Sequence, residues 1–142
     1  MRPDDLIQIV RWEEAEPALR AIRTAVFIHE QHVPEALEWD EFDVISVHLL
    51  ACDAGQPVGT ARLLPDGHIG RMAVLKEWRD QGIGSAMLRK LLQEMMRRHQ
   101  QKAWLNAQTS AVPFYEKFGF RVLGKEFMEA GIPHVKMTLL LK

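Results

Sequence analysis

The chain has 142 residues, 47% hydrophobic and 26% charged, proportions typical of one globular domain, so we expect a single domain over residues 1–142. Eighteen basic and nineteen acidic residues give a net charge of -1, which argues against a nucleic-acid partner held by phosphate neutralisation. The single cysteine, Cys52, excludes an internal disulfide and a cysteine-based zinc site. The sequence has neither the apolar core of a signal peptide nor the ~20 apolar residues of a membrane helix, so we expect a cytoplasmic protein and no membrane partner.

The first half of the chain predicts several strands and one long helix. Residues 6–12 (LIQIVRW) alternate in polarity and predict a strand, and EEAEPALRAIRTAVFIHEQ has apolar residues at helical spacing, with Pro17 near the helix start. Residues 34–43 (PEALEWDEFD) are acidic and long enough for one or two helical turns. ISVHLLACDA and PVGTARLLP predict two strands joined by a hairpin at AGQP, and HIGRMAVL predicts another strand.

In the second half, residues 82–99 form the clearest predicted helix, because apolar side chains recur every three or four positions. This apolar stripe consists of Ile83, Met87, Leu88, Leu91, Leu92, Met95 and Met96. KAWLNAQ predicts a short buried strand, VPFYEKF a short helix that ends at Gly119, and GFRVLGKEF and HVKMTLLLK two final strands. The whole order predicts an α/β (α+β) fold: a mixed, largely antiparallel sheet with helices on its faces.

The loop RDQGIGS, residues 79–85, places two glycines at the start of the 82–99 helix. A phosphate-binding P-loop would need four residues between its glycines and a following Lys-Ser/Thr, and a Rossmann fingerprint would need a third glycine; both are absent. A flexible helix entrance would by itself explain the glycines. The loop follows the strand MAV, however, and combines free helix N–H groups with the charge of Arg79, so it predicts an anion site suited to a pyrophosphate.

Val74 followed by RDQGIG also matches the R/Q-x-x-G-x-G/A motif of the GNAT N-acetyltransferase superfamily, which binds acetyl-CoA. AVPFYEKFGFRVL resembles the superfamily's second conserved block. VFIHEQHVPEALEWDEFD, LNAQTSAVPFYEKFGF and AGIPHVKM together resemble the small bacterial GNAT proteins typified by YjcF and ElaA. The resemblance covers nearly the whole chain. It implies the GNAT acyl-CoA N-acyltransferase fold, a mixed, mostly antiparallel seven-stranded sheet that is splayed between its fourth and fifth strands, HIGRMAV and KAWLNAQ, where the coenzyme enters.

The resemblance also implies contacts for acetyl-CoA as cosubstrate. The backbone of Met72, Ala73 and Val74 would hold the pantetheine arm and the acetyl carbonyl. Asn106, at the end of the fifth strand, would contact the pantetheine amides; its alternative role is to form a turn at the strand edge. The pyrophosphate would bind Arg79 and the loop amides. These amides belong to Gln81, Gly82, Ile83, Gly84 and Ser85.

Acetyl transfer also needs a proton for the departing thiolate. Tyr115 is the only tyrosine, and it lies in the family's Tyr-Glu-Lys-Phe-Gly-Phe segment. Phe114 and Phe118 are one helical turn apart and can both face the core, which turns Tyr115 about 100° away from them. We therefore predict that Tyr115 is the general acid. The alternative is a tyrosine at the core edge with its hydroxyl in water.

The general base remains open in the sequence, because HIGRMAV lacks the glutamate that many superfamily members carry on the fourth strand. Glu30, near the end of the first helix, is one candidate, with a solvated helix-end charge as its alternative role. His134 is another, since an imidazole titrates near the working pH, although it could also be bonded locally at a strand start. An ordered water is the third.

Two function classes follow. The first is an acetyl-CoA-dependent N-acetyltransferase acting on the primary amine of a small acceptor, and the acidic residues 34–43 would favour a cationic one. The second is a non-catalytic acyl-CoA-binding or sensing module on the same fold, because a fold does not fix a function. We expect no metal, since His29 and His32 lack a third ligand, and exposed strand edges would permit a homodimer.

Overall fold

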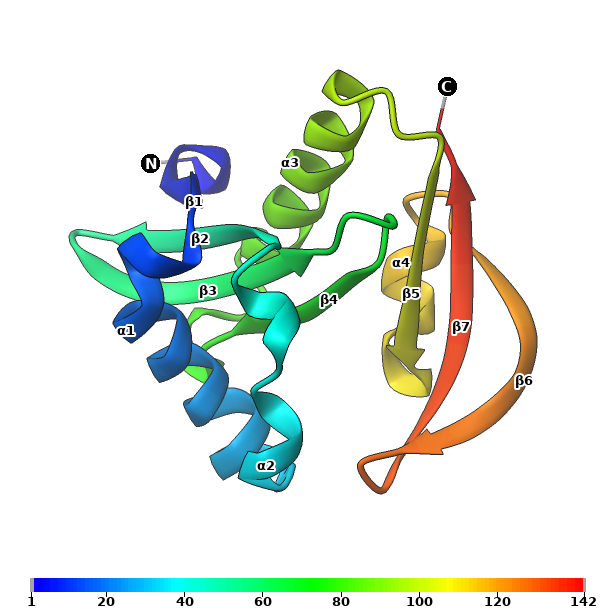
Figure 1. The fold of residues 1–142 in the computed structure, drawn as a ribbon, viewed down its shortest axis with the longest axis horizontal. Helices are drawn as coiled ribbons and strands as arrows, with labels where there is room; N and C mark the ends of the chain where they lie inside the picture. Colours follow the sequence, from blue (N-terminus) through cyan, green and yellow to red (C-terminus); the bar gives the residue numbers. More distant parts are fainter. Residues whose placement is uncertain (1, 142) are drawn as a thin grey trace.

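The computed structural model describes residues 2–141 as two antiparallel sheets flanked by helices (Figure 1). One sheet has the strand order β1-β2-β3-β4 and the other β5-β7-β6. The strands are β1 (Ile7–Val10), β2 (Val47–Asp53), β3 (Gln56–Leu63), β4 (Ile69–Val74), β5 (Lys102–Gln108), β6 (Arg121–Glu129) and β7 (Ile132–Leu140). The α-helices are α1 (Trp12–Arg23), α2 (Glu35–Glu38), α3 (Ile83–Arg97) and α4 (Val112–Glu116). A π-helix, η2 (Thr24–Glu30), and four 3-10 helices, η1 (Pro3–Leu6), η3 (Glu41–Asp43), η4 (Lys76–Trp78) and η5 (Thr109–Ala111), complete the elements.

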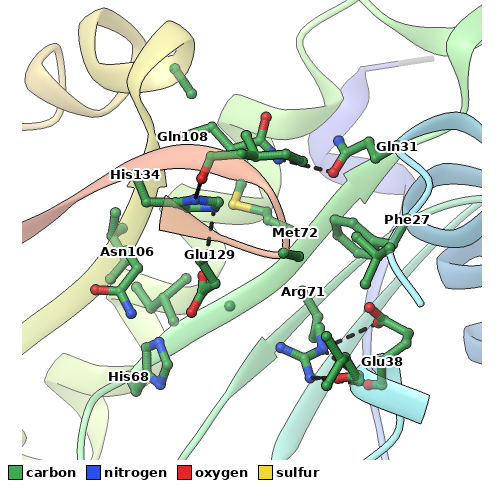
Figure 2. Close-up of a pocket in the computed structure, with 18 of the residues that line it drawn as sticks. Phe27, Gln31, Glu38, His68, Arg71, Met72, Asn106, Gln108, Glu129 and His134 are labelled. Carbon is green, nitrogen blue, oxygen red and sulfur yellow. Dashed lines mark hydrogen bonds and ion pairs between the residues drawn. The ribbon is translucent and has the colours of Figure 1, made fainter. Parts of the chain in front are cut away.

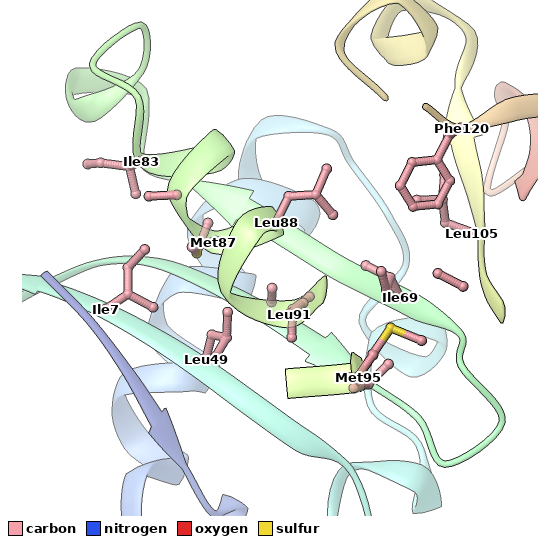
Figure 3. Packing of buried hydrophobic residues seen from close by; sticks show 14 of the residues in the cluster. Ile7, Leu49, Ile69, Ile83, Met87, Leu88, Leu91, Met95, Leu105 and Phe120 are labelled. Carbon is pink, nitrogen blue, oxygen red and sulfur yellow. The ribbon is translucent and has the colours of Figure 1, made fainter. Parts of the chain in front are cut away.

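Helices α1 and α3 cover opposite faces of the first sheet. Leu49 and Leu50 are neighbours on β2 but belong to different cores, because successive side chains of a strand point to opposite faces. Leu49 packs in the core that contains Met87 of α3 (Figure 3). Leu50 packs in the core that contains Leu19 and Ile22 of α1. Among residues 2–141, no helix is both long and apolar enough to cross a membrane.

The predicted hairpin between β2 and β3 is confirmed. Its two central residues, Ala54 and Gly55, have φ angles of 51° and 82°, the left-handed pair that suits a tight two-residue turn. The long helix predicted in the first half is instead split, because α1 ends at Arg23 and the chain continues as the π-helix η2. The predicted apolar stripe on α3 extends one residue too far, since Met96 is 44% exposed while Met95 is fully buried.

Strands β4 and β5 are adjacent but diverge, as Figure 1 shows. One parallel bridge joins them at the start of β4, between His68, which precedes Ile69, and Trp104 of β5, and the two rings stack there with centroids 3.9 Å apart. In the part of the chain that the structure describes, β4 otherwise pairs only with β3, and β5 only with β7. The predicted splay between the fourth and fifth strands is therefore confirmed, and it leaves one edge of β4 open.

Candidate functional site

A cavity of about 470 Å³ lies where β4 and β5 diverge (Figure 2). Its walls come from β4 and β5, from η2 and α2, and from the hairpin between β6 and β7. Six of the polar residues on the lining are Gln31, His68, Asn106, Gln108, Glu129 and His134. This volume suits a small molecule, and a small number of polar groups on the lining can fix the orientation of that molecule.

A β-bulge on β4 turns Arg71 toward the cavity. On the neighbouring strand β3, Arg62 lies opposite Gly70 and Thr60 opposite Ala73, so Arg71 and Met72 share a single partner position. Arg71 has a φ of 49°, in the left-handed region that a non-glycine residue rarely adopts. Such strain is held in place by surrounding contacts and is often found at functional sites.

A buried ion cluster supports the part of the cavity wall that α2 forms. Arg23 of α1 is 1% exposed, and it donates hydrogen bonds to Glu38 Oε2 and to Asp43 Oδ1, both at 2.7 Å. Burial raises the pKa of Glu38 despite the attraction of nearby arginines. For Asp43, burial also acts to raise the pKa, but hydrogen bonds and charges from Arg23 and Arg62 outweigh it and hold the pKa below its usual value. Both carboxylates are therefore bound within the cluster.

Arg62 and Arg71 complete the cluster and neutralise it. Arg62 contacts Asp40 at 2.7 Å and Asp43 at 3.0 Å, while Arg71 contacts Glu38 and Asp40, each at 3.2 Å. Three arginines thus face three of the carboxylates in the 34–43 region. The charges of Glu38, Asp40 and Asp43 are therefore paired, whereas Glu35 and Glu41 are exposed and form no ion pair among residues 2–141. The expectation that this acidic segment favours a cationic acceptor stays a prediction.

The glycine loop opens α3 as a set of free amides. Gly82 is the N-cap residue with a φ of 84°, and no side chain caps the helix. The first intrahelical bond runs from the Ala86 N–H to the Gly82 carbonyl, so three earlier amides lack a partner within the helix. They belong to Ile83, Gly84 and Ser85. A Cβ at Gly84 would lie 3.7 Å from the Phe114 ring, which is ordinary contact, so packing alone does not require that glycine.

Arg79 and Glu30, two of the predicted site residues, bind each other. The Arg79 guanidinium holds the Glu30 carboxylate through two hydrogen bonds, of 2.7 and 2.6 Å, and its Nε donates to the Val74 carbonyl at 2.9 Å. The hydrogen bond from Arg79 lowers the pKa of Glu30. Glu30 does not line the cavity, and a lowered pKa makes its carboxylate a weaker base.

Tyr115 lines the cavity, together with Met72. Its hydroxyl donates to the Met72 sulfur at 3.8 Å, a weak bond, and its ring lies edge-on to Phe114 with centroids 5.1 Å apart. The residue as a whole keeps some exposure, but its hydroxyl end is buried, and this burial raises the pKa of Tyr115 to about 12. The phenol therefore stays protonated at physiological pH.

His134 and Asn106 also line the cavity. His134 is bonded locally, since its Nδ1 lies 2.7 Å from the Ile132 carbonyl oxygen. Its Nε2 lies 3.6 Å from Glu129 Oε2 (Figure 2). Asn106 is half-buried on β5 and pairs across the sheet with Lys136 of β7. The structure thus gathers Tyr115, His134 and Asn106 at one cavity.

Other cavity residues were not predicted from the sequence. Gln108 donates to Gln31 at 2.9 Å, which links β5 to η2. Arg71 has no motif, and its position depends on the bulge. Glu129 stands beside the AGIPHVKM segment, so its proximity to His134 was the available signal. Among residues 2–141, no three His, Cys, Asp or Glu side chains gather in a way that could hold a metal ion.

The family model for the acetyltransferase (GNAT) domain matches residues 12–141. The chain belongs to the GNAT acetyltransferase family. YjcF of Bacillus subtilis, an uncharacterized N-acetyltransferase, is 42% identical over 120 residues, which cover 82% of this chain and 86% of YjcF. ElaA of Escherichia coli is 30% identical over 129 residues, covering 85% of this chain and 84% of ElaA. These relatives confirm the resemblance to small bacterial GNAT proteins.

Solved structures confirm the fold of this GNAT chain. The crystal structure of Escherichia coli ElaA superimposes with a TM-score of 0.84 at 28% identity, covering 93% of this chain and 97% of that one. An acyl-CoA N-acyltransferase from Pseudomonas aeruginosa gives the same TM-score and coverage at 29% identity. The family and fold support acyl-CoA-dependent acyltransferase activity.

The buried cluster predicts a large loss of stability for Arg23→Met. The change keeps the volume but leaves Glu38 and Asp43 as buried charges with fewer partners, so we expect the free energy of unfolding to fall by about 3–5 kcal/mol. Arg89→Met is the matched control, because Arg89 forms a half-exposed pair with Asp4 and should cost about 1 kcal/mol or less. Urea unfolding of the three proteins measures both changes. Equal losses would mean that the buried cluster does not stabilise the fold.

Proposed function

We propose that the chain is an N-acetyltransferase that moves the acetyl group of acetyl-CoA to a primary amine of a small acceptor by direct attack on the thioester. The observation that carries the proposal is that Tyr115 and His134 line one cavity at the open edge of β4. A proton donor and a proton acceptor are what this reaction requires. The family and the fold supply the expectation of an acyl-CoA donor.

The residues present fit acetyl-CoA at two places, the start of α3 and the open edge of β4. The amides at the start of α3 have no partner within the helix, and the missing Cβ atoms of Gly82 and Gly84 leave the backbone accessible to a phosphate. We propose that the pyrophosphate binds there. The amides that would contribute belong to Gln81, Gly82, Ile83, Gly84 and Ser85. Arg79 would add its charge. Its guanidinium, which binds Glu30 in this structure, would either bind Glu30 and the phosphate together or release Glu30 and bind the phosphate.

The pantetheine arm would lie along the open edge of β4. This edge has no partner strand beyond the His68 bridge in the described residues. Apart from the Val74 carbonyl, which Arg79 binds, the backbone groups of residues 72–74 on this edge would hydrogen-bond the arm and the acetyl carbonyl. Met72, Ala73 and Val74 are the residues concerned, and Asn106 of β5 lines the same cavity as Met72. An N–H on this edge would stabilise the charge that develops on the carbonyl oxygen.

In the proposed reaction, the acceptor nitrogen attacks the thioester carbonyl carbon, and the C–N bond forms as the C–S bond breaks. His134 Nε2 takes the proton from the nitrogen. The Ile132 carbonyl can only accept a hydrogen bond, so Nδ1 carries the hydrogen in the neutral ring and Nε2 keeps the lone pair. The sulfur leaves with the electrons of the C–S bond and takes the proton of Tyr115, which solvent replaces.

We assign the base to His134 rather than to Glu30. Glu30 is bound through both carboxylate oxygens by Arg79 and lies outside the cavity lining, whereas His134 is on that lining. The absence of a glutamate on β4 then leaves no gap in the mechanism, because the base comes from β7.

The test of this function is release of free thiol from acetyl-CoA in the presence of amines, polyamines, amino sugars and peptides. The N-acetyltransferase should release thiol with at least one acceptor, and acetyl-CoA should raise its heat-denaturation midpoint much more than NADH or ATP at equal concentration. Binding of acetyl-CoA with no thiol release from any acceptor would favour the non-catalytic acyl-CoA module.

Gly84→Glu should weaken acetyl-CoA binding. The substitution puts a negative side chain at the amides proposed for the pyrophosphate, so we expect an affinity loss of at least about tenfold, or ~1.4 kcal/mol. Gly84→Ala is the control, because its Cβ makes only ordinary contact with Phe114 and adds no charge. Calorimetric titration of both folded variants decides. Unchanged affinity in the glutamate variant would show that the loop is only a helix entrance.

Tyr115→Phe should lower turnover and spare binding. The ring packing against Phe114 survives, while the hydroxyl that would protonate the thiolate is lost. We expect kcat to fall by about 10²-fold or more, with acetyl-CoA affinity nearly unchanged. Steady-state kinetics with a working acceptor measure the first, and calorimetry the second. Retained turnover would assign thiolate protonation to water, and lost affinity would make Tyr115 a binding residue.

A further inference from the structure

Two hydrogen-bond acceptors face each other on the cavity lining. Glu129 Oε2 and His134 Nε2 are 3.6 Å apart, as the dashed line in Figure 2 marks. In the neutral ring Nε2 carries a lone pair, because Nδ1 donates to the Ile132 carbonyl. A carboxylate also only accepts. With the ring neutral, the pair therefore lacks a hydrogen between its two acceptors, and a cationic donor placed beside both would satisfy them.

The backbone around this pair is well defined. Ala130 and Gly131 turn the chain from β6 to β7 with φ angles of 51° and 76°, a tight two-residue hairpin. His134 is buried, and its ring stacks on Phe127, with ring centroids 6.0 Å apart. Glu129 is more exposed, with 53% of its side chain accessible, so it can reach a molecule that enters from solvent.

Glu129 is also the carboxylate of the lining that no arginine holds. The other lining carboxylate, Glu38, is bound by Arg23 at 2.7 Å and by Arg71 at 3.2 Å. Arg71, the arginine on the lining, is itself paired with Glu38 and Asp40. The negative charge that a ligand meets in the cavity therefore comes from Glu129.

Beside the paired Glu38, the side of the cavity formed by η2, α2 and the segment between them carries apolar side chains. Phe27, Val33 and Leu37 line it, and the amides of Gln31 and Gln108 bind each other. This wall suits a hydrocarbon or aromatic body, because it offers contact area and few free polar groups.

We propose that Glu129 and His134 dock the ammonium group of the acceptor, and that the acceptor is a primary amine with one cationic head and an apolar body. This inference rests on the proposed N-acetyltransferase function. The ammonium donates to Glu129 Oε2 and to His134 Nε2, then gives the second of these protons to Nε2. Solvent takes that proton from Nε2, which is then free to accept the proton that the nitrogen loses when it attacks the thioester. The nitrogen becomes neutral and nucleophilic, and Glu129 stabilises the imidazolium that forms. A carboxylate next to the amine would be repelled by Glu129.

The test compares phenethylamine with phenylalanine, which has the same body and an added carboxylate. The wild-type protein should acetylate phenethylamine with a kcat/KM at least about tenfold higher than that for phenylalanine. The reason is that repulsion between the phenylalanine carboxylate and Glu129 at close range costs about this much. Glu129→Gln should raise the KM for phenethylamine by about tenfold and reduce this discrimination. Glu129→Asp, which restores the charge, should recover part of the affinity.

Glu126→Gln is the matched control, because Glu126 is an exposed carboxylate on the same strand outside the cavity lining. If Glu129→Gln behaves as this control does, or if phenylalanine is the better acceptor, the docking inference is overturned and the acetyltransferase function still stands. If the wild-type protein releases no thiol from any amine, the proposed function fails. Calorimetric titration of the CoA-loaded protein with phenethylamine then decides the docking site alone: weaker binding in Glu129→Gln supports it, and equal binding overturns it.

Discussion

The divergence of β4 from β5 is the constraint on which the rest of this structure depends. The two strands meet at the stacked rings of His68 and Trp104 and separate beyond them. Where strands separate, each loses the partner that would satisfy its backbone groups along one edge, and such an edge is available to a ligand that can hydrogen-bond in extended form. The same separation opens the cavity of about 470 Å³. The open strand and the cavity are therefore two results of one feature.

A gap of this kind needs walls that do not collapse into it, and the ion cluster around Arg23 provides one. Glu38 and Asp43 come from short helices with little core of their own, so their buried bonds to Arg23 attach these helices to α1. Breaking a buried pair on one side is costly, which makes the attachment firm. Because the cluster is internally neutral, Glu38, Asp40 and Asp43 add no net charge for ligand recognition. Charge recognition then depends on groups outside the cluster, of which Glu129 is the clearest.

The sequence predicted the elements whose signals are local. The hairpin at AGQP, the amphipathic helix α3 and the glycine loop each depend on residues near one another in the chain, and the GNAT motif placed the splay correctly. The remainder depends on tertiary contacts. Glu38, Asp40 and Asp43 looked like part of a free acidic field because their arginine partners lie in α1, β3 and β4. Arg71 reaches the cavity because a bulge gives it a φ of 49°, and no residue pattern in the sequence indicates that bulge.

The ion pair between Arg79 and Glu30 connects the glycine loop to the cavity wall that η2 forms. Forty-nine positions separate these residues, so neither role predicted for them suggested that they bind each other. Glu30 ends the π-helix η2, and the same helix contributes Phe27 to the cavity wall. A π-helix has wider turns than an α-helix and is less favourable, so contacts at its end help to hold its form. An anion that binds Arg79 must share the guanidinium with Glu30 or replace it. The ion pair between Arg79 and Glu30 therefore links the charge at the glycine loop to the conformation of η2, which contributes Phe27 to the cavity wall.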